Sequence, residues 1–431
     1  MANLNEQVAE QSPQTSKVII AVNTSHGIGY FVDSEGTFLF NKQFEEVSKF
    51  TEGLAHVEQN GKIGFINTQG EVVVPCIYDW TVGWFSEGLT SVEQNGKRGY
   101  INTKGEVVIP CNYDDADWFS EGFAPVEQNG KWGYINTQGE MVIPCIYDNA
   151  VSFSEGLACV EQNGKWGFIN TKGEVIVPCI CDDAENFSEG LASVEQNDKW
   201  GFINTQGEVV IPCIYDGAGY FHKGLARVEQ NDKWGFINTK GEVIVPCIYD
   251  DVERFSEGLA RVEQNGKYGY INTQGEVVVP CIYDRVFDFS EGLVLVKQNE
   301  KWGFINTQGE LVVPCIYDYA GDFSEGLARV EQNGKWGFIN TQGEVVVPCI
   351  YDGVGDFSEG LAAANPGGKS GYINTQGEMV VPCIYDAAWP FSDGLAKVQQ
   401  NDKWSIINKE GKVMVAECAR ASTSWSKVEM E

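Results

Sequence analysis

One sequence motif recurs along this chain at a nearly fixed spacing. Residues 333–344 read NGKWGFINTQGE, and close copies stand at 197–208 and 129–140. The tryptophan of this motif, or its replacement, stands at Ile63, Arg98, Trp132, Trp166, Trp200, Trp234, Tyr268, Trp302, Trp336, Ser370 and Trp404. Successive copies are 34 residues apart, except for 35 residues between Ile63 and Arg98. Such a period indicates a tandem array of small structural units.

The array is expected to fill almost the whole chain. A weaker copy of the motif at Ile28-Gly29 brings the number of units to about twelve, from about residue 18 to residue 415. The first and last copies are degenerate, with FLFNKQF at 38–44 and WSIINKEGKVMVAEC at 404–418, which is typical of capping repeats. We therefore expect a disordered lead-in at 1–17, the array at 18–415 and a C-terminal tail at 416–431.

Each unit is predicted to hold three antiparallel strands. The segment 327–332, LARVEQ, alternates in polarity as a half-buried strand does. Asn333-Gly334 is the dipeptide of a type I′ hairpin, and KWGFIN at 335–340 forms the next strand. A second turn has Gly343 in the left-handed region and leads into VVVPC at 345–349. This third strand is apolar on both faces, so we expect it to be covered on both sides.

A glycine within the central strand lowers stability unless another backbone or an aromatic ring comes close. We therefore expect a close contact at the glycine after each tryptophan, and we expect the tryptophans themselves to be part of the core. No segment has an apolar period of 3.6 residues, so few helices are expected.

Two arrangements of the units are compatible with these strands. A closed ring resembling a β-propeller would have twelve blades, whereas propellers usually have four to eight, and its central channel would be wide. An open superhelix, resembling a solenoid, suits the degenerate ends better. We expect the open array, with the ring as the alternative.

The repeated residues K-W-G-[FY]-I-N-T-x-G-E-x-[VI]-[VI]-P-x-x-Y-D, followed by F-x-E-G-L-A-x-V, closely resemble the WG-containing repeat, also called the KWG repeat. The resemblance covers about residues 18–415. It implies a long β-rich array, mostly of bacterial type, that acts in binding or scaffolding without known catalysis. The chain departs from the pattern at Arg98 and Ser370, at Ser405, and at AAANPGG (362–368).

Charge excludes some classes of partner. The chain has 30 basic and 61 acidic residues, a net charge of −31, whereas nucleic acid binding requires clustered Lys and Arg. An anionic membrane surface is disfavoured for the same reason, and a basic protein surface or a cation is compatible. There is no signal-peptide pattern at the N-terminus and no apolar run of ~18–20 residues. We expect a cytoplasmic protein, with signal-less export as the alternative.

Cysteines occur once per unit, after a proline. Ten of the thirteen are placed in this way: Cys76, Cys111, Cys145, Cys179, Cys213, Cys247, Cys281, Cys315, Cys349 and Cys383. The chain has no CxxC motif and three histidines, His26, His56 and His222, so zinc-site spacing is missing. We expect small, buried, free thiols, with a ladder of disulfides between repeats as the alternative.

The other recurring polar motifs point to turns rather than to chemistry. NGKWG lacks the P-loop pattern, and the serine of FSEG has no recurring histidine to activate it. The YD aspartates lack the calcium-loop pattern and are expected to cap local amides. They stand at Asp79, Asp114, Asp148, Asp182, Asp216, Asp250, Asp284, Asp318, Asp352 and Asp386. We expect no catalytic residue, no metal and no cofactor, and therefore no enzyme.

Variation between copies marks the candidate binding surface. The copies differ most in the connector between YD and the phenylalanine of FSEG, and at x in LAxV. Connector loops on a rigid scaffold are common binding positions, although such loops also vary by neutral drift. The candidate binding residues are Trp80, Trp84, Trp118, Asn186, Tyr220, Arg254, Arg285, Tyr319, Asp356 and Trp389. We expect a protein partner at this surface, and the alternative is a carbohydrate that stacks on the exposed aromatic rings.

Overall fold

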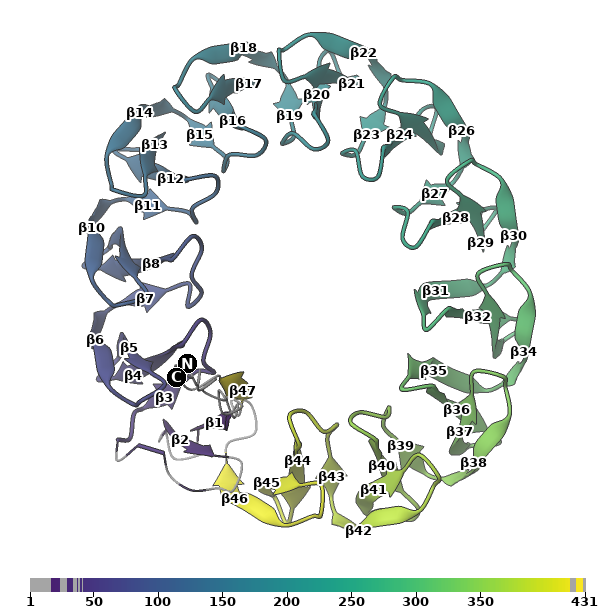
Figure 1. Ribbon diagram of the computed structural model, residues 1–431. Helices are drawn as coiled ribbons and strands as arrows, with labels where there is room; N and C mark the ends of the chain where they lie inside the picture. Colours follow the sequence, from purple (N-terminus) through teal and green to yellow (C-terminus); the bar gives the residue numbers. More distant parts are fainter. Residues whose placement is uncertain are drawn as a thin grey trace, which may run out of the picture.

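The computed structural model describes residues 17–23, 29–33, 37, 39–40, 42–418 and 424–428, and every regular element in these ranges is a β-strand. The strands form eleven four-stranded sheets and one three-stranded sheet. The sheets follow one another around a ring with a wide centre (Figure 1). The predicted all-β tandem array is confirmed.

Each four-stranded sheet is an antiparallel meander whose strands follow in chain order. The first strands are β3 (Glu46–Val47), β7 (Trp80–Thr81), β11 (Asp115–Ala116), β15 (Asn149–Ala150), β19 (Asp183–Ala184), β23 (Gly217–Ala218), β27 (Asp251–Val252), β31 (Arg285–Ser290), β35 (Tyr319–Ser324), β39 (Gly353–Val354) and β43 (Ala387–Ala388). The second strands are β4 (Leu54–Gln59), β8 (Leu89–Gln94), β12 (Phe123–Gln128), β16 (Leu157–Gln162), β20 (Leu191–Glu195), β24 (Leu225–Glu229), β28 (Leu259–Gln264), β32 (Leu293–Gln298), β36 (Leu327–Gln332), β40 (Leu361–Asn365) and β44 (Leu395–Gln400).

The third strands carry the WG motif, and the fourth carry the proline and cysteine. The third strands are β5 (Lys62–Asn67), β9 (Lys97–Asn102), β13 (Lys131–Asn136), β17 (Lys165–Asn170), β21 (Trp200–Asn204), β25 (Trp234–Asn238), β29 (Lys267–Asn272), β33 (Lys301–Asn306), β37 (Lys335–Asn340), β41 (Ser370–Asn374) and β45 (Lys403–Asn408). The fourth strands are β6 (Val72–Tyr78), β10 (Val107–Tyr113), β14 (Met141–Tyr147), β18 (Val175–Cys181), β22 (Val209–Tyr215), β26 (Val243–Tyr249), β30 (Val277–Tyr283), β34 (Leu311–Tyr317), β38 (Val345–Tyr351), β42 (Met379–Tyr385) and β46 (Val413–Cys418).

The sheets have one more strand than the three predicted from the sequence. The additional strand is the first one, and in most sheets it is only two residues long, as in Gly353–Val354. Two residues are too few to show an alternating pattern, so the connector gave no strand signal. These short strands lie at the inner edge of the ring and the fourth strands at the outer edge (Figure 1).

The two ends of the described chain share the twelfth sheet. Strand β1 (Lys17–Asn23) pairs with β2 (Gly29–Asp33) on one side and with β47 (Ser424–Val428) on the other, both antiparallel. The predicted tail at 416–431 therefore begins too early, because β46 runs to Cys418 and β47 belongs to a sheet. The lead-in predicted at 1–17 lies outside the described residues except for Lys17.

Of the two arrangements considered, the sheets follow the ring rather than the expected open superhelix (Figure 1). Consecutive four-stranded sheets share no strand, so they are joined by side-chain packing and by hydrogen bonds between turns. Pairing of β1 with β47 brings the first and last described strands together.

The predicted turns are present. Asn333 and Gly334 both have positive φ, 55° and 73°, as a type I′ turn requires. Where aspartate replaces the glycine, Asp198 takes the same conformation, with φ 59°. Gly343 has φ 80°, as predicted for the second turn.

The glycine of the WG motif lies under the backbone of the fourth strand. A Cβ on Gly337 would stand 2.4 Å from the carbonyl oxygen of Val347 and 2.7 Å from the amide nitrogen of Cys349. The ladder between β37 and β38 is interrupted here, since Phe338 pairs with Val347 but Trp336 pairs with Tyr351. The fourth strand therefore bulges across the glycine, which confirms the predicted close approach.

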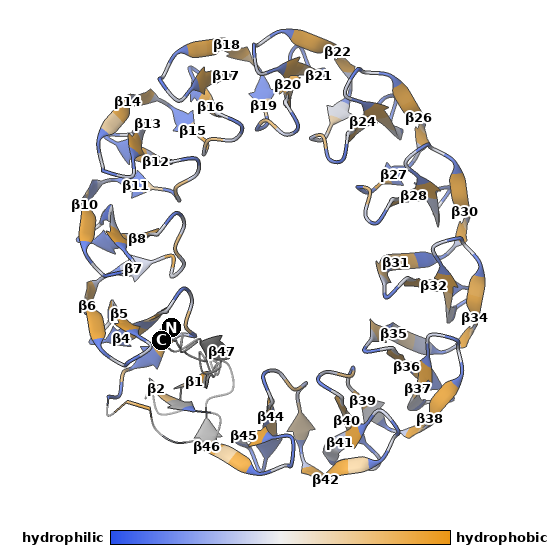
Figure 2. Cartoon of the chain, viewed as in Figure 1, coloured by the Kyte–Doolittle hydropathy of each residue, from blue (hydrophilic) through white to orange (hydrophobic). Residues whose placement is uncertain are grey.

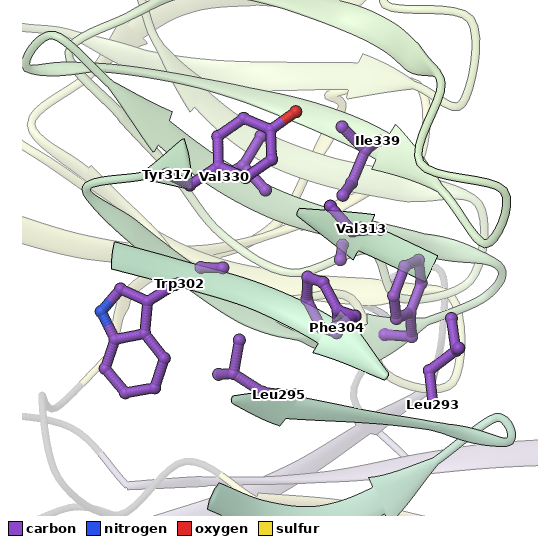
Figure 3. Packing of buried hydrophobic residues seen from close by; sticks show 11 residues of the cluster. Leu293, Leu295, Trp302, Phe304, Val313, Tyr317, Val330 and Ile339 are labelled. Atoms are coloured by element: carbon purple, nitrogen blue, oxygen red, sulfur yellow. The ribbon is translucent and has the colours of Figure 1, made fainter. Parts of the chain in front are cut away.

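The hydrophobic core lies between neighbouring sheets. In the cluster of Figure 3, Phe304 and Val313 come from one sheet, and Phe323, Val330 and Ile339 come from the next. The rings of Phe304 and Phe323 meet edge to face with centroids 4.8 Å apart. Equivalent pairs of aromatic rings occur at the other boundaries, as for Phe168 with Phe187 at 5.0 Å. Each sheet thus buries its apolar residues only when its neighbour is present.

The tryptophans of the motif are less buried than expected. Trp302 and Trp404 are buried, whereas Trp132, Trp200 and Trp336 are half-buried at the margin of a core cluster. The half-buried tryptophans cover the edge of the core and do not form its centre.

The fourth strands are not covered on both sides, contrary to the prediction. Val175 is 59% exposed and Ile180 is 56% exposed, while Val177 between them is buried. Figure 2 shows the resulting hydrophobic band along the outer edge of the ring. The strand looked apolar on both faces because Val175, Ile176 and Val177 are all apolar, although only Val177 of the three is buried.

Substitution of Gly337 by alanine is predicted to destabilise the protein by about 1–3 kcal/mol, because the added methyl group collides with backbone that cannot move independently. Gly353→Ala is the matched control, since a Cβ there meets nothing within 4 Å. Urea unfolding followed by circular dichroism would show a lower midpoint for Gly337→Ala only. Equal midpoints for the two variants would contradict the steric role of the glycine.

Candidate functional site

The serine and glutamate of FSEG join one repeat to the next. The Ser120 hydroxyl donates to the Phe153 carbonyl at 2.9 Å. The Glu121 carboxylate accepts from the amides of Glu155 and Gly156, both at 2.8 Å. Glu155 itself has φ 54°, a strained conformation for a residue with a side chain. The motif therefore carries a structural bond between repeats, and the acceptor carboxylate holds the strained turn in place.

The YD aspartates also link repeats rather than capping local amides as expected. The Asp216 carboxylate pairs with Lys199 of the preceding sheet and accepts from the amide of Asn231 in the following hairpin at 2.7 Å. The hydrogen bond from Lys199 is the main cause that lowers the pKa of Asp216. The same pair of bonds recurs at most of the junctions. Asp352 is different: its carboxylate pairs with Lys335, but among the described residues it accepts no amide of the next hairpin, which reads NPGG; only the backbone amide of Asp352 bonds there, to the Asn365 carbonyl at 2.7 Å.

The cysteines have a packing role. The Cys349 thiol lies 3.7 Å from the carbonyl oxygen of Val330, the residue opposite Gly337. Twelve cysteines are described and all are free thiols. Burial raises the pKa of Cys349, which lowers its thiolate fraction and its reactivity at neutral pH.

Within the described ranges, no three His, Cys, Asp or Glu side chains are grouped so as to hold a metal ion. The described part of the chain also has no helix long and apolar enough to cross a membrane. Of the two described histidines, His56 has its pKa lowered, mainly by burial.

The candidate binding residues all lie on the first strands or in the loops that follow them, at the inner edge of the ring (Figure 1). The structure brings some of them together. The Arg254 guanidinium lies 3.8 Å from the centre of the Tyr220 ring, and Trp389 meets Trp404 at 4.7 Å. Asn186 and Arg285 are exposed.

Two more candidates contact residues of the repeated strands. Tyr319 lies between Trp302 and Trp336, with ring centroids 5.9 Å and 5.4 Å away. The Asp356 carboxylate lies 3.0 Å from Nε of Arg329.

Three candidates meet in one cavity. Trp80, Trp84 and Trp118 line a hollow of about 190 Å³, which we call the Arg98 pocket. Its other lining residues are Val82, Ser86, Leu89, Thr90, Ser91, Arg98, Tyr100, Ala116 and Asp117. The pocket lies between the sheet β7–β10 and the first strand of the next sheet, β11.

Arg98 stands where most repeats have tryptophan. Its guanidinium pairs with Asp115 and lies 4.7 Å from the centre of the Trp80 ring. Sequence reasoning noted Arg98 as a departure but did not place it, Ser91 or Asp117 in a site. The available signal was that Arg98, the polar Thr90-Ser91 pair and the 35-residue spacing all fall within one repeat.

Ser370, another replacement of the motif tryptophan, also lines a cavity. Ser370 lines a hollow of about 280 Å³ together with Gly355, Asp356, Ala363 and Pro390. Its walls have no aromatic ring. In both places, loss of the tryptophan leaves space between neighbouring first strands.

These features define a class: a ring of tandem antiparallel β-sheets joined by packing and by bonds between turns. A family model agrees. The model of the WG containing repeat matches residues 31–62, 63–97, 99–132, 132–166, 166–200, 200–234, 234–268, 268–302, 302–336, 336–369 and 371–404. The chain belongs to the WG-containing repeat family, as its sequence motif predicted. No curated protein matches it.

Solved structures resemble it only loosely. A eukaryotic initiation factor shares 12% identity over 76% of this chain and 95% of its own, with a TM-score of 0.36. The extracellular domain of a putative one-component system from B. thetaiotaomicron shares 8% identity over 97% and 72%, with a TM-score of 0.24. PorZ, a surface component of the type-IX secretion system of Porphyromonas gingivalis, shares 9% identity over 95% and 75%, with a TM-score of 0.23.

Substitution of Asp216 by asparagine is predicted to lower stability at neutral pH and to have a smaller effect in acid. A carboxylate whose pKa is lowered by folding stabilises the fold above its unfolded pKa, about 3.9, and loses that effect as the pH falls through the folded pKa. In urea unfolding at pH 7 and at about pH 3, the variant should have the lower midpoint at pH 7, and its difference from wild type should be smaller at pH 3. Asp352→Asn, which loses a lysine partner but no hairpin bond, should have the smaller effect.

Substitution of Ser370 by tryptophan is predicted to stabilise the protein by about 1 kcal/mol, because it refills a cavity with the residue that the repeat uses elsewhere. Ser370→Ala is the control for loss of the hydroxyl. A melting temperature below that of wild type would show that the cavity differs from the tryptophan site.

Proposed function

We propose that this protein is a non-catalytic scaffold that binds a protein partner through the connectors at the inner edge of its ring. The observation that carries the proposal is that shared and variable residues occupy different parts of each repeat. The shared residues build the sheets and their junctions, whereas the variable residues lie side by side at the inner edge (Figure 1).

The composition of this edge supports a protein interface. Tyrosine, tryptophan and arginine are the residues that most often dominate binding energy at interfaces. Tyr220 with Arg254 and Tyr319 with its two tryptophans supply such groups on neighbouring first strands and connectors. A rigid array of sheets holds them in fixed positions, which lowers the entropy that binding costs.

Charge favours a partner with a basic surface. The net charge of −31 steers a positively charged protein toward the ring and repels nucleic acid and anionic membranes. We place the protein in a reducing compartment, the cytoplasm, because its described cysteines are free thiols.

A binding role is also simpler than catalysis for these residues. The FSEG serines donate to backbone carbonyls of the next repeat, as Ser120 does to Phe153, so their hydroxyls are engaged in structure. The YD aspartates are held by lysines in one environment repeated along the chain. General acid–base chemistry needs carboxylates in unlike environments.

A triple variant, Tyr220→Ala with Arg254→Ala and Arg285→Ala, is predicted to weaken partner binding at least about tenfold while the melting temperature stays close to wild type. The experiment captures the partner on immobilised protein from a host-cell extract, identifies it by mass spectrometry and measures its affinity at increasing salt. Affinity should fall as salt screens the charges.

The matched control changes the outer edge instead, with Val175→Thr, Val243→Thr and Val277→Thr. These valines are 57–59% exposed on fourth strands. Loss of capture by the outer-edge variant, with the inner-edge variant unaffected, would overturn the proposal.

A further inference from the structure

One repeat combines several departures from the common pattern, and all of them line the Arg98 pocket. Arginine replaces the motif tryptophan, Thr90-Ser91 replaces alanine and the variable residue of LAxV, and the connector is one residue longer and carries Trp84. The following connector contributes Trp118. Independent drift at these positions would not be expected to converge on one cavity.

A buried polar group without a hydrogen-bond partner belongs to Ser91, a residue that lines this cavity. The Ser91 hydroxyl is in a residue only 3% exposed and has no hydrogen-bond partner. Ser91 pairs with Tyr100 across the sheet, and Glu93 pairs with Arg98, so Ser91 shares a strand face with the pocket residues Tyr100 and Arg98. An unpaired buried hydroxyl destabilises the folded protein, and a hydrogen bond to a ligand hydroxyl would offset that cost.

The pocket offers aromatic faces beside a small number of polar groups. Trp84 and Trp118 are 53% and 52% exposed, so their rings are available to a ligand. Asp117 accepts from the amide of Trp118 at 2.9 Å, and burial raises the pKa of its carboxyl. Arg98 supplies a guanidinium that is already paired with Asp115.

These groups select the class of ligand. The carboxylates of Asp115 and Asp117 disfavour an anion. Because the Arg98 guanidinium is already paired with Asp115, it does not repel a cation, and the cationic sugar glucosamine is the competitor that the test must exclude. The cavity, about 190 Å³, is smaller than the roughly 300 Å³ at which drug-sized sites begin, so it holds a single ring. A neutral ring with one apolar face and several hydroxyls satisfies the tryptophans, the serine and the carboxylate together.

We propose that the Arg98 pocket binds one neutral pyranose, as a free sugar or as the terminal residue of an oligosaccharide. The apolar face of the ring packs on a tryptophan, and its hydroxyls bond to Ser91 and Asp117. This site is separate from the protein-binding arc of Tyr220, Arg254 and Arg285, and does not depend on it.

The Ser370 cavity shows why an opening between sheets is not sufficient. It is larger, about 280 Å³, but its lining consists of Gly, Val, Ala, Pro, Ser, Asn and Asp residues without an aromatic ring. No stacking face is available there, so we assign it no sugar and use it as the internal control.

The test is calorimetric titration of the full chain, with saturation-transfer NMR, against glucose, galactose, mannose and N-acetylglucosamine. Glucosamine and glucuronate are the cationic and anionic counterparts, and N-acetyltryptophanamide stands for an aromatic side chain of a protein partner. At least one neutral pyranose should bind saturably and more tightly than the charged sugars. Methyl glycosides and disaccharides then distinguish a free sugar from a terminal residue.

Two variants locate the binding. Arg98→Trp restores the residue of the common repeat, fills the cavity and should abolish binding while the protein stays folded. Ser91→Ala should weaken binding roughly tenfold, as expected for loss of one buried hydrogen bond. Ser370→Trp and the triple variant of the protein-binding arc should bind the sugar as wild type does.

Three results would overturn the proposal. The first is that no neutral pyranose binds with a dissociation constant of ~10 mM or lower, which corresponds to a binding free energy of about −3 kcal/mol. The second is unchanged sugar binding in Arg98→Trp, and the third is binding of N-acetyltryptophanamide without binding of any sugar. None of these results bears on the partner-capture experiment with the protein-binding arc. Failure of the sugar proposal is therefore distinguishable from failure of the proposed protein scaffold.

Discussion

The crossing of a backbone over a glycine is the constraint on which each repeat depends. With no side chain at Gly337, the bulged segment at Pro348 and Cys349 can lie directly over the central strand. The cysteine then reaches the carbonyl of Val330 on the strand beyond. The three long strands are thereby held together at one point. Any larger residue would push the outer strand away, which accounts for the glycine at this position in all but the last four-stranded sheet, where Ser405 replaces it.

The sequence predicted those features that depend on residues adjacent in the chain. The Asn-Gly turns, the turn at Gly343 and the close approach at the WG glycine follow from residues next to one another in the chain. The direction in which sheets follow each other does not, because it is set by contacts between neighbouring sheets, such as that of Phe304 with Phe323. The expectation of an open superhelix had no such contact to use. The exposure of Val175 and Ile180 was missed because nearly every residue of this strand is apolar, so the sequence has no polar positions to mark the exposed face.

The candidate site was predictable in part. Trp80, Trp84 and Trp118 stood out as aromatic residues in variable connectors, and the structure places them in one cavity. Arg98 and Ser91 belong to the repeated strands, where variation looks like loss of a consensus residue. Their role depends on facing the first strand of the next sheet, which a single repeat does not reveal. Departures from a repeat are therefore best considered together when they fall within the same copy.

The pairing of the chain ends has a mechanical consequence. In β1 and β47 the outermost residues, Lys17 and Val428, stand directly opposite each other, and the ladder continues inward to Ala21 and Ser424. Tension applied between the two termini would break the β1–β47 ladder one residue pair at a time, in the unzipping geometry. It would not load all five pairs at once, as shear does. The eleven four-stranded sheets would bear no force until the β1–β47 pairing had separated. The terminal sheet is thus the first part of the ring to be loaded, ahead of the eleven four-stranded sheets.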